Sequence, residues 1–302
     1  LPDNYPHDVS YRTSTLGEEI ARIHIPGRNT RLTDHSGPDG HWPTPEPPHR
    51  INQRYIEPIL RRHVQKQSLI TCLFRHQVVS FTQDEHQVAA QIQNLDSPES
   101  PAFNLTAAYM VGCDGGRSMV RKGMGAKLVG DEVVQRVQST CIRAPQLIAH
   151  MKAAPAWAMF TVNPRRSGNI YAIDGQEVWL IHNYLRDHEA DFDAVDRDWA
   201  IRTILGVGED FEYEQMSRED WFGRRLVSDK VREGRVFLAG DAAHLWVPYA
   251  GYGMNAGLAD AAPRGGVAAE NIRDGAAGLV GVPVAILSTA GAACDAGRSG
   301  QG

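Results

Sequence analysis

Residues 234–260 read GRVFLAGDAAHLWVPYAGYGMNAGLAD. Within them, Val236-Phe237-Leu238-Ala239 is a continuous apolar run, which is typical of a buried strand. The run ends at Gly240-Asp241 and is followed by a segment that contains a proline and several glycines. A helix of small residues is predicted to begin near Gly253. The stretch therefore predicts a strand, an irregular loop and a helix in succession.

This succession suits the binding of a flat ligand that carries hydroxyl groups. Asp241 would lie at the end of the buried strand, where its carboxylate can bind a ligand hydroxyl. The helix N-terminus offers unpaired backbone N–H groups and the positive end of the helix dipole, and glycines let a ligand approach the backbone closely. The alternative is an ordinary strand–loop–helix unit with a surface aspartate, because Gly-Asp dipeptides are common.

A second strand end shows the same features. Ala107–Val111 is predicted as a strand that leads into Gly112-Cys113-Asp114-Gly115, and a short helix carrying Arg121 follows. Open α/β sheets bind ligands at the carboxyl ends of their strands, which is where Asp114 would lie. The alternative is a simple Asp-Gly turn, the commonest use of that dipeptide.

Taken together, the two motifs resemble those of the FAD-dependent aromatic hydroxylases, the para-hydroxybenzoate hydroxylase-like family of flavoprotein monooxygenases. The resemblance rests on GRVFLAGDAAH with the following P-x-x-G-x-G-M-N-A-G, and on the Asp114-Gly115 string. Both occur in the family's order, and the resemblance covers roughly residues 1–262. One departure is Ala250-Gly251, where the family usually has two glycines.

The resemblance implies roles for individual residues. Asp241 would hold the ribityl chain of FAD, Pro248 would lie near the reactive edge of the flavin, and the Gly253-Met254-Asn255 backbone would meet the pyrimidine ring. The Asp114 motif would also serve the passage of reduced nicotinamide. The implied cofactor-binding residues are Gln53, Asp114, Gly115, Arg121, Gly240, Asp241, Pro248, Gly251, Gly253, Met254 and Asn255.

The implied fold is α/β, with a three-layer, Rossmann-like FAD-binding domain interleaved with a substrate domain built on an antiparallel sheet. The family takes the FAD pyrophosphate on a GxGxxG loop, which this sequence lacks, so the FAD-binding domain is expected to be incomplete at its N-terminus. The predicted parts are a substrate-domain hairpin and loop (1–48), FAD-binding parts (49–130 and 226–262), a substrate domain (131–225) and an atypical tail (263–302).

Local patterns predict further elements. Two alternating segments flank Asp174-Gly175, which is the strongest short-range hairpin signal in the chain. The predicted strands are 9–13, 20–25, 69–75, 77–83, 87–93, 168–173 and 176–184, and the predicted helices are 51–66 and 196–205.

Candidate catalytic residues are Pro248, His182 and Tyr184. His182 and Tyr184 lie two residues apart on one strand face and could line a phenol pocket; the alternative is that they are ordinary packed sheet residues. Tyr11 is a weaker candidate with the same alternative. His244 is interpreted as a residue that hydrogen-bonds its turn rather than as a catalytic base.

The resemblance implies hydroxylation of a phenolic or related aromatic compound. NADPH or NADH would reduce FAD, oxygen would add to give a C4a-hydroperoxide, and its distal oxygen would pass to the ring. The cofactor carries this chemistry and the protein positions it. Two alternatives stay open: a truncated, catalytically silent homologue with weak or no FAD binding, and a flavin enzyme with another reaction such as epoxidation.

Bulk properties restrict the function classes. The chain has 302 residues, 42% of them hydrophobic, and a net charge of −5, which argues against a nucleic-acid surface. Its cysteines are widely spaced, so no metal site is predicted and a cytoplasmic location is expected. No apolar run approaches the ~20 residues of a membrane span. The expected partners are a small aromatic substrate and molecular oxygen, with a homodimer left open.

Overall fold

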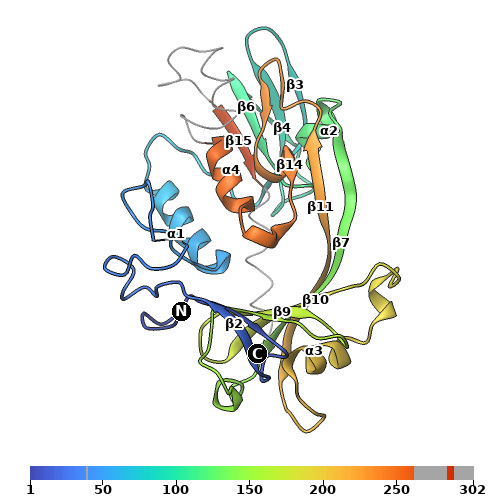
Figure 1. Cartoon of the computed structure of the whole chain (residues 1–302). Coiled ribbons are helices and arrows are strands. Elements are labelled where there is room, and N and C mark those ends of the chain that lie inside the picture. Colours follow the sequence, from blue (N-terminus) through green and yellow to red (C-terminus); the bar gives the residue numbers. More distant parts are fainter. Residues whose placement is uncertain (39, 262–283, 289–302) are drawn as a thin grey trace. The chain divides into compact units, whose positions relative to one another are not determined.

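The computed structural model describes residues 1–38, 40–261 and 284–288, and its secondary structure is mapped in Figure 1. The chain divides into two compact units, each built from two chain segments. Unit 1 comprises Leu1–Ile70 and Gln135–Phe222, and unit 2 comprises Thr71–Val134 and Gly223–Gly302. Two long strands, β7 (Leu128–Arg143) and β11 (Glu214–Ser228), contribute residues to both units.

Unit 1 is built on a sheet in which β10, β9, β8, β1 and β2 follow one another, with the end of β7 beside β10. All of these pairs are antiparallel except β1 with β8, which are parallel. The substrate domain was predicted to be built on an antiparallel sheet, and the sheet of unit 1 differs from this at one pair, β1 with β8. The strands are β1 (Val9–Arg12), β2 (Glu19–Ile23), β8 (Ala158–Thr161), β9 (Gly168–Ala172) and β10 (Val178–Tyr184).

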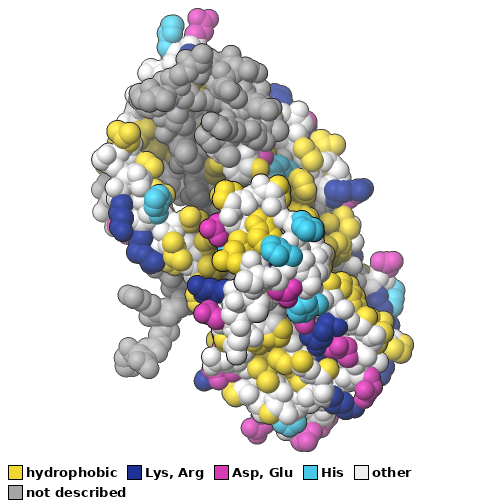
Figure 2. All heavy atoms as spheres, turned by 60° about the vertical axis from the view of Figure 1, so that its left-hand side comes forward, with side chains coloured by type: hydrophobic (Ala, Val, Ile, Leu, Met, Phe, Trp, Pro, Cys, Tyr) yellow, Lys and Arg dark blue, Asp and Glu magenta, His cyan; other side chains and the backbone are white. Residues whose placement is uncertain are grey.

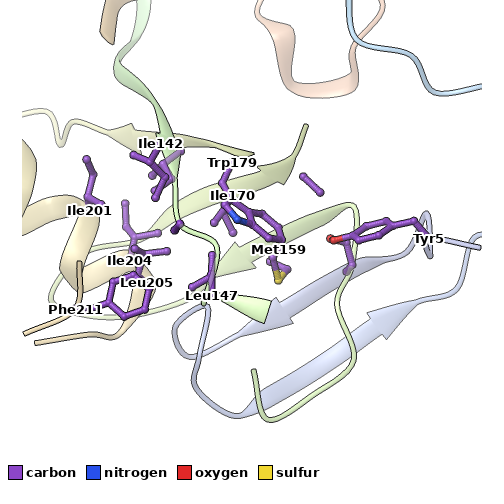
Figure 3. Packing of buried hydrophobic residues seen from close by; sticks show 14 residues of the cluster. Tyr5, Ile142, Leu147, Met159, Ile170, Trp179, Ile201, Ile204, Leu205 and Phe211 are labelled. Carbon is purple, nitrogen blue, oxygen red and sulfur yellow. The ribbon is translucent and has the colours of Figure 1, made fainter. Parts of the chain in front are cut away.

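Strand alternation decides which face of this sheet is buried. In β10, Trp179 and Ile181 are almost fully buried, whereas the residues that alternate with them, Val178, Leu180 and His182, are half-buried. Helix α3 (Arg197–Leu205) packs Ile201, Ile204 and Leu205 into the same core, as Figure 3 shows. Asp196 caps α3 by accepting a hydrogen bond from the Trp199 amide at 2.7 Å.

Unit 2 contains two sheets. In the first, β12 (Arg232–Glu233), β13 (Val236–Leu238), β6 (Tyr109–Cys113) and β15 (Val284–Ser288) lie in that order, and β6 runs parallel to both β13 and β15. The second is an antiparallel sheet of β3 (His76–Gln83), β4 (Val88–Asn94) and β5 (Phe103–Ala107).

The remaining elements are short. Unit 2 also holds α2 (Met119–Gly123), α4 (Gly253–Ala261), and β14 (His244–Leu245), which pairs with β11. Unit 1 holds α1 (Gln53–Gln65). Four single turns of 3-10 helix complete the description: η1 (Ile148–His150), η2 (Phe192–Ala194), η3 (Gly240–Ala242) and η4 (Pro248–Ala250).

The α/β class is confirmed, and most predicted elements form near their predicted positions. The strand predicted at 69–75 is wrong, since no strand forms there. Leu69 is 98% exposed and the backbone of Arg75 adopts a left-handed φ of 59°, so this segment finds no buried surface and cannot continue an extended conformation. The strand predicted at 107–111 begins later, as β6, and β5 precedes it.

The units change over at residues 70/71, 134/135 and 222/223, whereas the predicted boundaries were 48/49, 130/131 and 225/226. Helix α1, predicted with the FAD-binding parts, belongs to unit 1. The functional names of the predicted parts stay predictions. Most of the predicted tail lies outside the described residues, apart from β15.

Candidate functional site

The two motifs lie at the ends of neighbouring parallel strands in unit 2. Leu238 of β13 pairs with Gly112 of β6, and the Ala239 amide donates to the Gly112 carbonyl at 3.0 Å. Asp241 and Asp114 each follow their strand by a few residues, so both belong to the same carboxyl edge of the sheet. This is the edge at which open α/β sheets bind ligands.

Asp241 presents its carboxylate to solvent from η3. It is exposed, and among the described residues its side chain has no hydrogen-bond or ion-pair partner. Gly240 before it has a φ of 59°, a left-handed conformation that glycine adopts without strain. The turn thus ends the buried strand and leaves an acceptor available to a ligand.

Asp114 is engaged locally. Its Oδ2 accepts hydrogen bonds from the backbone amides of Met119 at 2.7 Å and Val120 at 3.1 Å, at the start of α2. Its Oδ1 is buried and has no hydrogen-bond partner among the described residues. A buried carboxylate oxygen without a donor is costly, so a ligand donor at this point would stabilise the loop.

Arg121 connects the two motif loops. Its side chain is buried, and it donates to the Ala242 carbonyl at 2.8 Å and to the Gly116 carbonyl at 2.7 Å. Desolvation lowers the pKa of its guanidinium, and the charge of Asp114 opposes this shift. The resemblance implied a cofactor contact for Arg121, and this contact stays a prediction. In the structure, Arg121 joins the two motif loops by hydrogen bonds.

The start of α4 is an open, glycine-rich surface. Pro248, Gly251, Gly253, Met254 and Asn255 are all exposed. A methyl group built on Gly251 or Gly253 would meet no atom within 4 Å. Large apolar side chains around them are also exposed: Trp246, Tyr249, Tyr252, Met254 and Leu258.

Figure 2 shows hydrophobic side chains at the surface of the molecule, interspersed with charged and histidine side chains. An open glycine backbone beside apolar side chains and an unpaired carboxylate fits a flat ring with a hydroxylated chain. The residues present therefore fit FAD.

Asp260 and His244 complete the unit 2 site. Asp260 Oδ2 accepts from the Gly240 amide at 2.8 Å and contacts His244 Nε2 at 2.7 Å. The side chain of His244 was expected to hydrogen-bond its own turn, but it bonds Asp260 of α4 instead. Asp260 was not predicted, because its partners lie 16 and 20 residues away and no local pattern links them.

The candidate catalytic residues of unit 1 lie on the half-buried face of its sheet. His182 of β10 packs edge-on against Tyr171 at 5.3 Å, Trp221 at 5.7 Å and Tyr184 at 6.3 Å between ring centroids. Tyr11 stacks on Phe160 at 5.3 Å. These residues form an aromatic wall, of which Tyr171 and Trp221 were not predicted because strand pairing alone brings them beside His182.

Polar atoms of this aromatic wall are held in place by a buried asparagine. Asn169 donates from Nδ2 to the hydroxyls of Tyr184 at 2.9 Å and Tyr171 at 3.2 Å. Desolvation lowers the pKa of His182 to about 4, so its imidazole is neutral at pH 7 and can accept a hydrogen bond. Burial raises the pKa of Tyr171, so its phenol remains protonated.

Gln53 is the first residue of α1 and is exposed, with its amide donating to Glu57. The helix has no buried residue, and its apolar residues Tyr55 and Ile59 are exposed. Gln53 belongs to unit 1, whereas Asp114 and Asp241 belong to unit 2. A common site for the three residues stays a prediction.

Comparison with known proteins agrees with this geometry. The sequence profile of the FAD binding domain matches residues 14–278. The chain therefore belongs to the FAD binding domain family, and the recognised resemblance to flavin-dependent aromatic hydroxylases is confirmed.

Curated relatives are monooxygenases and hydroxylases. An FAD-dependent monooxygenase of Penicillium oxalicum is 27% identical over 274 residues, which are 86% of this chain and 52% of the relative. A putative polyketide hydroxylase of Streptomyces halstedii is 32% identical over 215 residues, covering 70% of this chain and 38% of the relative. The chain thus spans about half the length, or less, of these relatives.

Among solved structures, the rebeccamycin biosynthetic enzyme RebC with reduced flavin superimposes with a TM-score of 0.75 at 29% identity. The match covers 90% of this chain and 48% of that one. Within the described ranges, no helix combines the length and apolar character needed to cross a bilayer.

Proposed function

We propose that this chain is the flavin-binding part of an FAD-dependent monooxygenase that uses NADPH or NADH to hydroxylate a phenolic or related aromatic substrate. Family membership and relatives named as monooxygenases and polyketide hydroxylases support the proposal. The observation that carries it is the unpaired, exposed carboxylate of Asp241, in a loop that is attached to α4, together with the exposed, glycine-rich start of that helix.

Each residue of the unit 2 site has a role in this proposal. Asp241 would accept a hydrogen bond from the ribityl chain, and the exposed backbone around Gly253 at the start of α4 would lie against the ring. Positive potential at the N-terminus of α4 favours the reduced, electron-rich state. Asp114 and Gly115 bind from the neighbouring strand end, and Pro248 borders the reactive edge.

Bound FAD, reduced by the nicotinamide, supplies the electrons with which molecular oxygen inserts one atom into the ring and leaves the other as water. The protein must position the aromatic ring, exclude water and remove a phenolic proton. We assign these tasks to the aromatic wall of unit 1. His182 is neutral at pH 7 and can accept a hydrogen bond from the substrate hydroxyl, and Tyr184 can bind a substrate oxygen.

The first test is a titration of the full chain with FAD, followed by flavin absorbance and fluorescence. We expect saturable binding, and we expect Asp241→Ala to raise the dissociation constant by about tenfold or more, because a hydrogen bond to a charged group contributes roughly 1.5–3 kcal/mol. Asp96→Ala is the matched control, since Asp96 is an exposed aspartate of unit 2 that pairs with Arg75.

A chain that takes up no FAD would refute the proposal and favour the catalytically silent homologue. If FAD binds, substrate-stimulated oxidation of NADPH and NADH in the presence of phenols tests the reaction. Identification of the product separates hydroxylation from epoxidation.

A further inference from the structure

Asp260 connects the last turn of α4 to the loop that carries Asp241. We call residues 240–244 the Asp241 loop. The same oxygen of Asp260, Oδ2, lies 2.8 Å from the Gly240 amide at the start of the loop and 2.7 Å from His244 Nε2 at its end. One carboxylate oxygen therefore joins both ends of the loop, and Asp241 lies between them.

The bonds are sheltered from water. The side chains of His244 and Asp260 are 16% and 15% exposed. Because Asp260 Oδ2 is an acceptor, His244 Nε2 carries the proton in this contact. Trp246 packs edge-on against the imidazole at 5.4 Å between centroids. The imidazole is thus held by a hydrogen bond on one side and by an aromatic ring on another.

The same face of α4 contacts the loop one turn earlier. A Cβ built on Gly257 would lie 3.4 Å from the Cα of Gly240, which is ordinary van der Waals contact. Gly257 and Asp260 are three residues apart, so they lie on one side of the helix. Two successive turns of α4 therefore fix the position of Gly240.

Three further hydrogen bonds hold the backbone of the loop. The Ala243 amide donates to Gly240 at 2.8 Å, and the Ala243 carbonyl accepts from Ser228 at 2.7 Å. Arg121 donates to the Ala242 carbonyl at 2.8 Å. None of these bonds involves α4, so the hydrogen bonds that attach the loop to α4 are those of Asp260 to the Gly240 amide and to His244.

We propose that Asp260 is a positioning residue for the cofactor: through Gly240 and His244 it fixes the direction of the Asp241 carboxylate relative to the start of α4. The proposal rests on the proposed function, because it assigns Asp241 to the ribityl chain. Asp260 itself contacts neither cofactor nor substrate in this proposal. It sets the distance between the Asp241 loop and the start of α4, which both contact the flavin.

The test compares Asp260→Ala with Asp260→Asn in the full chain. Alanine removes both hydrogen bonds, so we expect the dissociation constant for FAD to rise by about tenfold and the visible circular dichroism of bound flavin to change. Asparagine keeps an oxygen acceptor, so we expect an affinity within about threefold of wild type. This rescue by the conservative variant distinguishes positioning from the mere presence of charge.

Asp84→Ala is the matched control. Asp84 also accepts two backbone amides, from His86 at 2.7 Å and Gln87 at 2.8 Å, but it does so in the turn between β3 and β4 of unit 2. We expect it to lower the melting temperature without changing the FAD affinity. Hydrogen exchange of the peptide covering 236–245 provides a readout without FAD, and it should accelerate in Asp260→Ala only.

Each outcome is decisive. If Asp260→Ala binds FAD with wild-type affinity and an unchanged flavin spectrum, the positioning role is overturned while the proposed function stands. If the wild-type chain binds no FAD, both are overturned. Unchanged exchange at 236–245 in Asp260→Ala would contradict the attachment itself.

Discussion

At the scale of single residues, the two units place polar groups by different means. In unit 2, the side chain of Asp241 has no partner among the described residues, while the backbone around it is held by bonds at Gly240, Ala242 and Ala243. In unit 1, burial makes His182 a neutral base, and Asn169 orients the neighbouring phenols. The sequence motif predicted Asp241 because carboxylate and glycines lie close along the chain. It could not predict Asn169 or Asp260, whose partners are brought together only by folding.

The low pKa of His182 makes the stability of the protein depend on pH. Desolvation lowers its folded-state pKa from 6.5 to about 4, so between these values the unfolded state binds more protons. The contribution of the neutral His182 to the free energy of unfolding is therefore fully present above pH 6.5, and it is lost as the pH is lowered toward 4. We expect His182→Gln to remove about 2 kcal/mol of this loss at pH 4.5, because each pKa unit corresponds to about 1.4 kcal/mol.

Urea unfolding of both proteins at pH 7 and pH 4.5 measures this difference. His7, whose pKa is also lowered to about 4 by burial and by the charges of Arg50 and Arg31, is present in both proteins, so its contribution cancels. Equal pH dependence in the two proteins would show that His182 is accessible to protons in the folded state.

At the scale of elements, hairpins were predictable where the turn itself carries the signal. Asp174-Gly175 connects β9 and β10 in the observed structure, and Asp174 accepts from the amides of Gln176, Glu177 and Val178. The lengths of β7 and β11 were not predictable, since about half of each strand is exposed and lacks an alternation of buried and exposed residues. Residues 69–75 were predicted as a strand from their apolar composition but form none, because composition alone does not supply a neighbouring strand or a buried surface.

The Asp174-Gly175 turn should tolerate no side chain at its second residue. Gly175 has a φ of 75°, and a Cβ there would lie 2.8 Å from the ring of the buried Tyr5. We expect Gly175→Ala to destabilise the chain by about 2–3 kcal/mol, from backbone strain together with the clash. The measurement is the free energy of unfolding in urea.

Gly125→Ala provides the comparison for that variant. Gly125 has a similar φ of 66°, but an added Cβ would meet no atom within 4 Å. It should show the strain alone, about 1 kcal/mol. An equal effect of the two substitutions would contradict the packing of Tyr5 against the turn.

At the scale of the whole molecule, the family and the α/β class followed from two short motifs, because each combines a buried strand with a glycine turn and an acid. The composition of the rest of the chain is ordinary, and it left the parallel pairing of β1 with β8 unpredicted. In the proposed function, the aromatic wall of unit 1 binds the substrate, and the strand ends of unit 2 bind FAD. Above all, we propose that the ends of β6 and β13 bind one flavin.

A crystal structure of the full chain soaked with FAD tests this claim most directly. We predict a ribityl hydroxyl within about 3 Å of the Asp241 carboxylate, the flavin ring against residues 251–255, and the Asp114 loop on the same ligand. FAD bound elsewhere, with Asp241 still facing solvent, would contradict the account.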